Sequence, residues 1–182
     1  MQEWYWAVML LAHSGCRAKE VVQLLTADIR QDKDGGWFFN VVWKEAGADA
    51  TAEPQLKNRK SDRQVPIHSN LLKAGFLDWY TPRHTDRRLF PLLFPYGLVK
   101  TTMTFSRLLK KLKIKRPALS LHSLRHTMTI KLERARVHYS LMRRLLGHSI
   151  GKSVEDRVYL GSLKYSVKEL SEALEAVRFP AI

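Results

Sequence analysis

The chain has 182 residues, of which 45 % are hydrophobic, so it suits one folded domain and is not an intrinsically disordered protein. Lysine and arginine number 31 against 17 aspartates and glutamates, which gives a net charge of +14. This excess favours a polyanionic partner, with nucleic acid first and a membrane surface second, over a charge that serves solubility alone.

The first predicted helix covers residues 3–13. Its apolar run WYWAVMLLA (4–12) is too short to cross a bilayer, and Gln2 and Glu3 precede it where a signal peptide would carry basic residues. The run therefore predicts a largely buried helix. Cys16 is the only cysteine, which excludes an internal disulfide and a cysteine-type zinc site and fits an intracellular, reducing setting.

A second helix and a small sheet are predicted next. Gly15 suits a tight turn, and the apolar residues from Val21 to Leu25 give one face of a helix over about 17–25. Aromatic and β-branched runs bounded by glycine and aspartate indicate strands. In chain order we expect a turn (32–36), a strand (37–43), a hairpin with a basic tip (55–67), a helix (69–80) and an irregular connection with three prolines (81–97).

From residue 102 onward the pattern is helical. The expected helices cover 104–116, 120–135 with Ser120 as N-cap, 139–146 ended by Gly147, SVEDRVYL (153–160) and 166–177. The sequence contains no internal repeat or low-complexity segment. The pattern therefore predicts a single domain over 1–182, mainly α with a small antiparallel β-sheet (α+β).

The helix predicted over 104–116 has two contrasting faces. Its apolar stripe consists of Phe105, Leu108, Leu109 and Leu112. Its other residues include six cations and no acid, namely Arg107, Lys110, Lys111, Lys113, Lys115 and Arg116. Such a one-signed surface favours contacts to a DNA backbone over the ordinary alternative, a solvated helix face. Lys60, on the predicted hairpin, is also expected to contact DNA.

The segment LHSLRHT (121–127) gathers His122, Arg125 and His126 within five positions. On a helix, His122 and Arg125 share a face. A metal site is disfavoured, because Arg125 would repel a cation and no Cys, Asp or Glu nearby completes a ligand set. An arginine beside a histidine suits a phosphate, since the guanidinium fork holds two oxygens while the imidazole exchanges a proton. His126 is interpreted as packing or hydrogen bonding near the site.

Further groups suited to phosphate chemistry are spread along the chain. They are Arg17 at a helix start, Lys57 and Lys60 on the predicted hairpin, His148 just past a helix end, and Tyr159 in VEDRVYLG. A helix N-terminus favours anions, so Arg17 there would add a second clamp. Taken singly, each has an ordinary structural explanation, such as an ion pair between Arg17 and Glu20 or a core position for Tyr159.

In this order the residues resemble the catalytic domain of the tyrosine recombinases, the phage integrase family, from about Trp4 to Val177. SGCRAKEVVQLLTADI (14–29) is similar to the family's first box, with Arg17 as its first arginine and Glu20 as its acidic companion. The other matches are Lys57 before SDRQVPI, with Lys60 as the alternate; His122 and Arg125 in the His-x-x-Arg box; His148 in LLGHS; and Tyr159 in the place of the nucleophile. Tyr165 is the alternate nucleophile, because the spacing from His148 to Tyr159 is longer than in many members.

The resemblance implies a reaction at a DNA phosphate that uses neither a metal nor another cofactor. Tyr159 would attack a backbone phosphate and form a 3′-phosphotyrosine. Arg17 and Arg125 would neutralise the charge of the transition state. The remaining roles are proton transfer to the leaving oxygen by Lys57, assistance at the tyrosine by His122, and a hydrogen bond to the phosphate from His148.

The resemblance also implies partners and rival functions. Members of the family work on double-stranded DNA, usually as tetramers, whereas isolated catalytic domains are often monomers; the expected location is the cytoplasm, on the nucleoid. Members also carry a separate helical domain before this one, so we expect that this chain is an excised catalytic domain. In members a C-terminal helix often docks on a neighbouring subunit, and 166–177 would do this or fold back onto its own domain. The rivals are a type IB topoisomerase, a DNA-binding module with an inactive pocket, and a basic RNA-binding domain.

Overall fold

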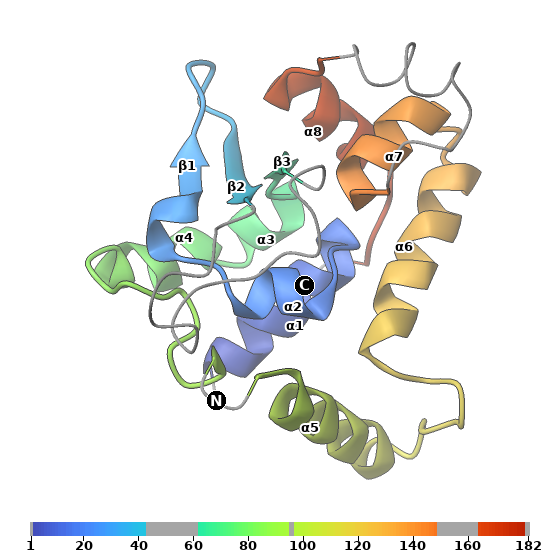
Figure 1. Ribbon diagram of the computed structural model, residues 1–182. Coiled ribbons are helices and arrows are strands. Elements are labelled where there is room, and N and C mark those ends of the chain that lie inside the picture. Colours follow the sequence, from blue (N-terminus) through green and yellow to red (C-terminus); the bar gives the residue numbers. More distant parts are fainter. Residues whose placement is uncertain (1, 43–61, 95–96, 149–163, 181–182) are drawn as a thin grey trace.

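The structure is a computed structural model that describes residues 2–42, 62–94, 97–148 and 164–180. Its helices in this part are α1 (Gln2–Ser14), α2 (Ala18–Val22), α3 (Ser69–Lys73), α4 (Phe76–Tyr80), α5 (Gly97–Lys111), α6 (Leu121–Arg134), α7 (Tyr139–Leu146) and α8 (Val167–Glu175), with short 3-10 turns η1 (Thr26–Asp28) and η3 (Thr81–Arg83). Its strands are β1 (Ile29–Gln31), β2 (Trp37–Val41) and β3 (Arg63–Pro66). In Figure 1, α6 runs between α5 at one end of the molecule and the α7–α8 pair at the other, and α1 and α2 lie between α6 and the sheet.

The small sheet confirms the predicted fold class, mainly α with a few antiparallel strands. Its order is β1-β2-β3, and both pairs are antiparallel. Phe39 of the central strand pairs with Ile29 on one side and Val65 on the other, and all three side chains are buried. The turn expected over 32–36 joins β1 to β2. The sequence prediction lacks β1, because three residues of which only one is buried carry no alternating pattern.

Two helices near the middle of the chain differ from their predictions. The helix expected over 69–80 is divided into α3 and α4, because Gly75 adopts φ +88° between them and turns the chain. The prediction for 104–116 is wrong at both ends, since α5 begins at Gly97 and ends at Lys111.

The backbone after Lys111 explains why α5 ends earlier than predicted. Lys113 adopts φ +58°, and the Ile114 backbone N–H donates to the Leu109 carbonyl at 3.0 Å, which closes the helix with a Schellman motif. Leu112, expected on the apolar stripe, is 55 % exposed, whereas Phe105 and Leu109 are buried. The cations Lys113, Lys115 and Arg116 therefore lie in the connection between α5 and α6 rather than on a helix face.

Buried side chains form two groups that meet where α1 packs on α6. The larger group joins α1, α2, the sheet, α3, α4 and α5, and the smaller one joins α6, α7 and α8. The predicted stripe of the last helix (Val167, Leu170, Leu174 and Val177) is fully buried, with α8 packed on α7 and β3. The helix thus folds back onto its own domain. No helix in the described part of the chain is long and apolar enough to cross a membrane.

Candidate active site

The site begins at the tight turn between α1 and α2. Gly15 adopts φ +66°, as the sequence predicts for a turn, and a Cβ there would come within 2.7 Å of Leu146 and 2.9 Å of Met128. The glycine therefore lets the turn press against α6 and α7. This contact sets Arg17, the N-cap residue of α2, beside the C-terminal end of α7.

Glu20 is the acidic centre of the site. It is 2 % exposed, and its carboxylate accepts hydrogen bonds from the Arg17 backbone N–H at 2.7 Å, Arg17 Nη1 at 2.8 Å and Arg63 Nη2 at 2.8 Å. Burial alone would raise the pKa of Glu20, but the charge of Arg63 and these hydrogen bonds hold it below its ordinary value. Glu20 is thus a carboxylate at neutral pH, and the expected ion pair between Arg17 and Glu20 is present.

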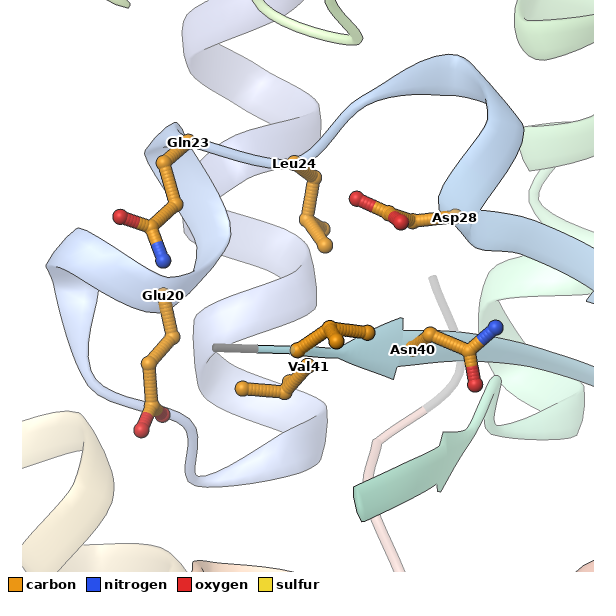
Figure 2. Close-up of a pocket in the computed structure, with 7 residues that line it drawn as sticks. Glu20, Gln23, Leu24, Asp28, Asn40 and Val41 are labelled. Atoms are coloured by element: carbon orange, nitrogen blue, oxygen red, sulfur yellow. The ribbon is translucent and has the colours of Figure 1, made fainter. Parts of the chain in front are cut away.

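A small pocket lies behind Glu20, between α2 and β2. It is lined by Glu20, Gln23, Leu24, Asp28, Asn40, Val41 and Val42. Figure 2 shows Glu20 projecting from α2 and Gln23 from the residue after its end, with the Glu20 carboxylate turned away from Gln23. The acid therefore lines this pocket while its charged end serves the arginines.

Arg63 is a site residue that the sequence prediction missed. As the first residue of β3 it is 3 % exposed, and its Nε donates to the Leu145 carbonyl at 3.0 Å while Nη2 donates to Cys16 Sγ at 3.4 Å. A signal for it was available, because the period of two along a strand places Arg63 on the same side as the buried Val65. A charged residue on a core-facing position indicates a buried ionic partner.

Arg125 projects from α6 toward the same turn. Arg125 is 6 % exposed, its Nη1 donates to the Gly15 carbonyl at 2.8 Å, and its Nη2 is buried without a hydrogen-bond partner in the described part of the chain. Burial, followed by the charge of Arg17, lowers the pKa of Arg125 to about 10, so it remains a cation at neutral pH. Its second nitrogen is a donor in need of an acceptor.

His148 completes the group at the end of α7. Gly147 ends the helix at φ +63°, as predicted, and its carbonyl lies 3.4 Å from both Nη1 and Nη2 of Arg17. The His148 backbone N–H donates to the Arg143 carbonyl at 3.1 Å. Partial burial, then the charges of Arg125 and Arg17, lower the pKa of His148, so its imidazole is neutral at pH 7.

The two histidines of the segment LHSLRHT (121–127) lie at the surface. His122 is exposed on α6, one turn before Arg125, which places it toward the rim of the site. His126, interpreted from the sequence as packing near the site, is exposed, so the packing interpretation is wrong. Among the residues that the structure describes, no three His, Cys, Asp or Glu side chains gather as ligands of a metal ion.

Three predicted residues, Lys57, Lys60 and Tyr159, lie outside the described residues. Tyr165, the alternate nucleophile, is half-buried, and its hydroxyl lies 2.5 Å from Ser140 Oγ. Ser140 is near the start of α7 and Gly147 follows its end, so about 10 Å of helix separates them. Tyr165 is thus held at the end of α7 opposite the arginines.

Of the basic residues predicted to contact DNA, Lys60 lies outside the described residues and the other six are exposed. Arg107, Lys110 and Lys111 lie on α5, opposite the buried Phe105 and Leu109. The remaining three follow the helix, as Lys113, Lys115 and Arg116. Lys115 Nζ donates to the Leu119 carbonyl at 2.5 Å, which holds this connection near the start of α6.

The sequence and the fold are similar to those of known proteins. Residues 3–164 match the model of the phage integrase family. The chain belongs to this family. A search of curated proteins found no match. Two solved structures of the XerH site-specific recombinase share the fold: a pre-cleavage complex with difH substrate at TM-score 0.54 and 20 % identity, and a post-cleavage complex with palindromic difH substrate at TM-score 0.55 and 19 % identity. The alignments cover 84 % and 85 % of this chain but 41 % of each recombinase, so the chain spans about two fifths of their length.

Proposed function

We propose that the protein is a site-specific DNA recombinase or integrase that cleaves and rejoins strands through a 3′-phosphotyrosine on Tyr159. The observation that carries the proposal is the excess of buried positive charge at the end of α7. Arg17 and Arg63 share one carboxylate, Glu20, while Arg125 donates to the Gly15 carbonyl and its Nη2 has no hydrogen-bond partner among the described residues. A polar group with no partner is costly to bury, so a bound anion would satisfy it.

A scissile phosphate suits this group of donors. Arg17 is anchored by Glu20 through one nitrogen, yet its side chain remains 47 % exposed and open to solvent. Arg125 and Arg17 would together take up the negative charge that develops on the non-bridging oxygens. Because His148 is neutral, its ring can donate one hydrogen bond to the phosphate without adding a fourth charge.

The remaining roles follow the family's pattern. Tyr159 is the nucleophile, Lys57 (with Lys60 as the alternate) protonates the leaving 5′-oxygen, and His122 assists proton transfer at the tyrosine. The arginines here supply the charge stabilisation that metal ions supply in other phosphoryl transfers. The position of Tyr165, engaged with Ser140 at the far end of α7, favours Tyr159 over it.

Double-stranded DNA is the proposed partner, and a tetramer on two duplexes the proposed assembly. The exposed cations on and after α5 support contact with backbone phosphates, and the XerH structures similar in fold are complexes with a DNA substrate. We expect Lys110→Ala to weaken duplex binding across all sequences and to reduce the slope of log affinity against log salt by about 1. Lys73→Ala on α3 is the matched control, and fluorescence anisotropy over a salt series measures both. Equal slopes for the two variants would contradict the assignment.

The direct test is covalent capture of the cleaved strand. The protein is incubated with a pool of nicked duplexes that trap the product, and a denaturing gel with mass spectrometry locates any adduct. We expect DNA on Tyr159, lost in Tyr159→Phe and retained in the matched Tyr165→Phe. DNA on Tyr165 would overturn the nucleophile assignment, and no adduct with any duplex of the pool would contradict the proposed reaction.

A further inference from the structure

Arg63 carries out no step of the chemistry proposed above, yet it donates hydrogen bonds to three residues around the site. It lies on β3, outside the helices that carry the phosphate-binding residues. Its three nitrogens reach Glu20 and Cys16 at the start of α2 and Leu145 at the end of α7. We infer that Arg63 is a positioning residue that sets the spacing between Arg17 and His148. The inference rests on the proposed function and deepens it.

The first step is the link from Arg63 to Arg17. Both arginines donate to the same carboxylate: Arg17 Nη1 to Glu20 Oε1 and Arg63 Nη2 to Glu20 Oε2, each at 2.8 Å. Glu20 is 2 % exposed, and a buried carboxylate without its cation would protonate or move toward solvent. Arg17, half exposed, does not bury Glu20 by itself. Arg63 therefore keeps the anion in place against which Arg17 is oriented.

The second step is the link from Arg63 to His148. Arg63 Nε holds the Leu145 carbonyl, three residues before His148, and the guanidinium lies directly against Gly147. A Cβ added at Gly147 would overlap Arg63 Nη1, so the two residues have no space between them. The Gly147 carbonyl then faces Arg17. The contacts close a ring that runs from Arg63 through Glu20, Arg17 and Gly147 back to Arg63.

Only an arginine can close this ring. The planar fork donates in several fixed directions at once: to Leu145 from Nε, to Glu20 Oε1 from Nη1 at 3.3 Å, and to Glu20 Oε2 from Nη2. A lysine would keep the charge but would bond one side of the ring at a time. Its charge also bears on the site, since Arg63 is among the cations that lower the pKa values of His148 and Arg125. The same residue thus sets the spacing and, after burial and the charges of Arg125, Arg17 and Arg143, adds to the lowering of the His148 pKa.

The test uses Arg63→Lys, with Arg63→Met as a second variant that removes the charge. Arg83→Lys is the matched control, because Arg83 bonds the Trp79 carbonyl at 2.6 Å far from the site. Duplex affinity and the rate of covalent adduct formation at saturating DNA are measured for each folded variant. We expect Arg63→Lys to cut the rate about 10- to 100-fold, as a small misplacement of a reacting group does, and to change affinity less than about threefold. We expect Arg83→Lys to change neither.

Two NMR readouts in free protein separate this inference from the proposed function. In Arg63→Lys the Arg17 Nη signals, held by Glu20 in the wild type, should lose their protection from exchange, and in Arg63→Met the His148 titration should move to higher pH. A wild type that forms an adduct, with Arg63→Lys reacting within threefold of it, overturns the inference and leaves the function intact. If the wild type forms no adduct, the function fails, and the inference stands or falls on whether the Arg17 signals change in Arg63→Lys.

Discussion

Two clusters of polar side chains join α6, α7 and α8 to the N-terminal half, and they differ in how their charges are balanced. The arginine cluster comprises Arg17, Arg63, Arg125 and Glu20, with three cations on one acid. The histidine cluster comprises His13, His68, Glu175 and Phe179, and it lies at the C-terminal ends of α1 and α8. The first buries more charge than it neutralises, whereas the second closes with aromatic contacts and hydrogen bonds.

In the histidine cluster most polar atoms have local partners, and the exception among the described residues, His13 Nε2, belongs to a ring that is neutral at pH 7. His68 Nδ1 accepts from the Asn70 N–H at 3.1 Å, and Nε2 faces the Val177 carbonyl at 3.2 Å. Glu175 accepts from the backbone N–H of Ser69 at 2.6 Å, and the ring of Phe179 lies 4.1 Å from that of His13. A cluster of this kind docks a chain segment and needs no ligand. The contrast teaches that the missing counter-charge, rather than the number of polar residues, marks the functional site.

Arg125→Met tests most directly whether the unbalanced charge of the arginine cluster serves function rather than stability. The variant removes a cation whose Nη2 bonds none of the residues that the structure describes, so the loss of the bond to Gly15 is partly offset by relief of repulsion from Arg17 and Arg63. We expect adduct formation to fall about 10²- to 10³-fold, the effect of removing one charge-stabilising donor, while the free energy of unfolding changes by less than about 2 kcal/mol. Urea unfolding and the capture assay measure the two quantities. Parallel losses of stability and rate would make Arg125 a structural residue.

Gly147→Ala tests how tightly the arginine cluster is packed. Its Cβ would meet the Arg63 guanidinium, and its backbone is at φ +63°, so strain and overlap add. We expect a loss of about 3 kcal/mol in the free energy of unfolding. Gly35→Ala is the matched control: Gly35 also has positive φ, at +85°, but its nearest neighbour would lie 3.8 Å away. The control should lose only about 1 kcal/mol, and equal losses would show that Arg63 does not press on Gly147.

The sequence predicted the parts of the site that local patterns carry. Arg17 at a helix start, Arg125 on a helix face and His148 after a glycine all come from short-range spacing, and the fold brings them together. Arg63 pairs with Glu20, 43 residues away, and nothing in the strand signal names the acid that a buried cation will meet. The pairing becomes visible only once α2, α7 and β3 are packed.

The helices and strands also differ in how well local sequence patterns predict them. α7 and α8 have clear apolar periodicity and, like α6, lie where they are predicted, whereas β1 is too short to show an alternation. The end of α5 was misplaced because lysines suit a helix and a connection equally. The helix ends because Lys113 adopts the left-handed conformation, four residues before Pro117.

Phe179→Ala tests the histidine cluster. Phe179 is half-buried, with its ring against His13 and His68 and with Lys131 Nζ 5.0 Å from the ring centre. We expect a loss of about 2 kcal/mol in the free energy of unfolding and faster hydrogen exchange over 166–180. The rate of adduct formation by the folded protein should change less than about twofold. Lys168→Ala, on the exposed face of α8, is the control and should leave both quantities near the wild-type values.

Acid provides the smallest and most specific test of the histidine cluster. Burial lowers the pKa of His13 below its ordinary 6.5; the nearby groups are His68 and Lys131, which lower it further, and Glu175 and the Met9 carbonyl, which raise it. A histidine with a lowered pKa in the folded state takes up protons more readily when unfolded, so stability is complete above pH 6.5 and declines as the pH falls through the window below it. At pH 5.5 the loss from His13 is at most about 1 kcal/mol.

The pKa of His148 is also lowered, so the wild type is compared with His13→Gln, which retains the contribution of His148. We expect the wild type to lose more stability than His13→Gln between pH 7 and 5.5, as measured by urea unfolding. Identical slopes would mean that His13 accepts its proton in place, and that the histidine cluster, like the arginine cluster, tolerates a buried charge.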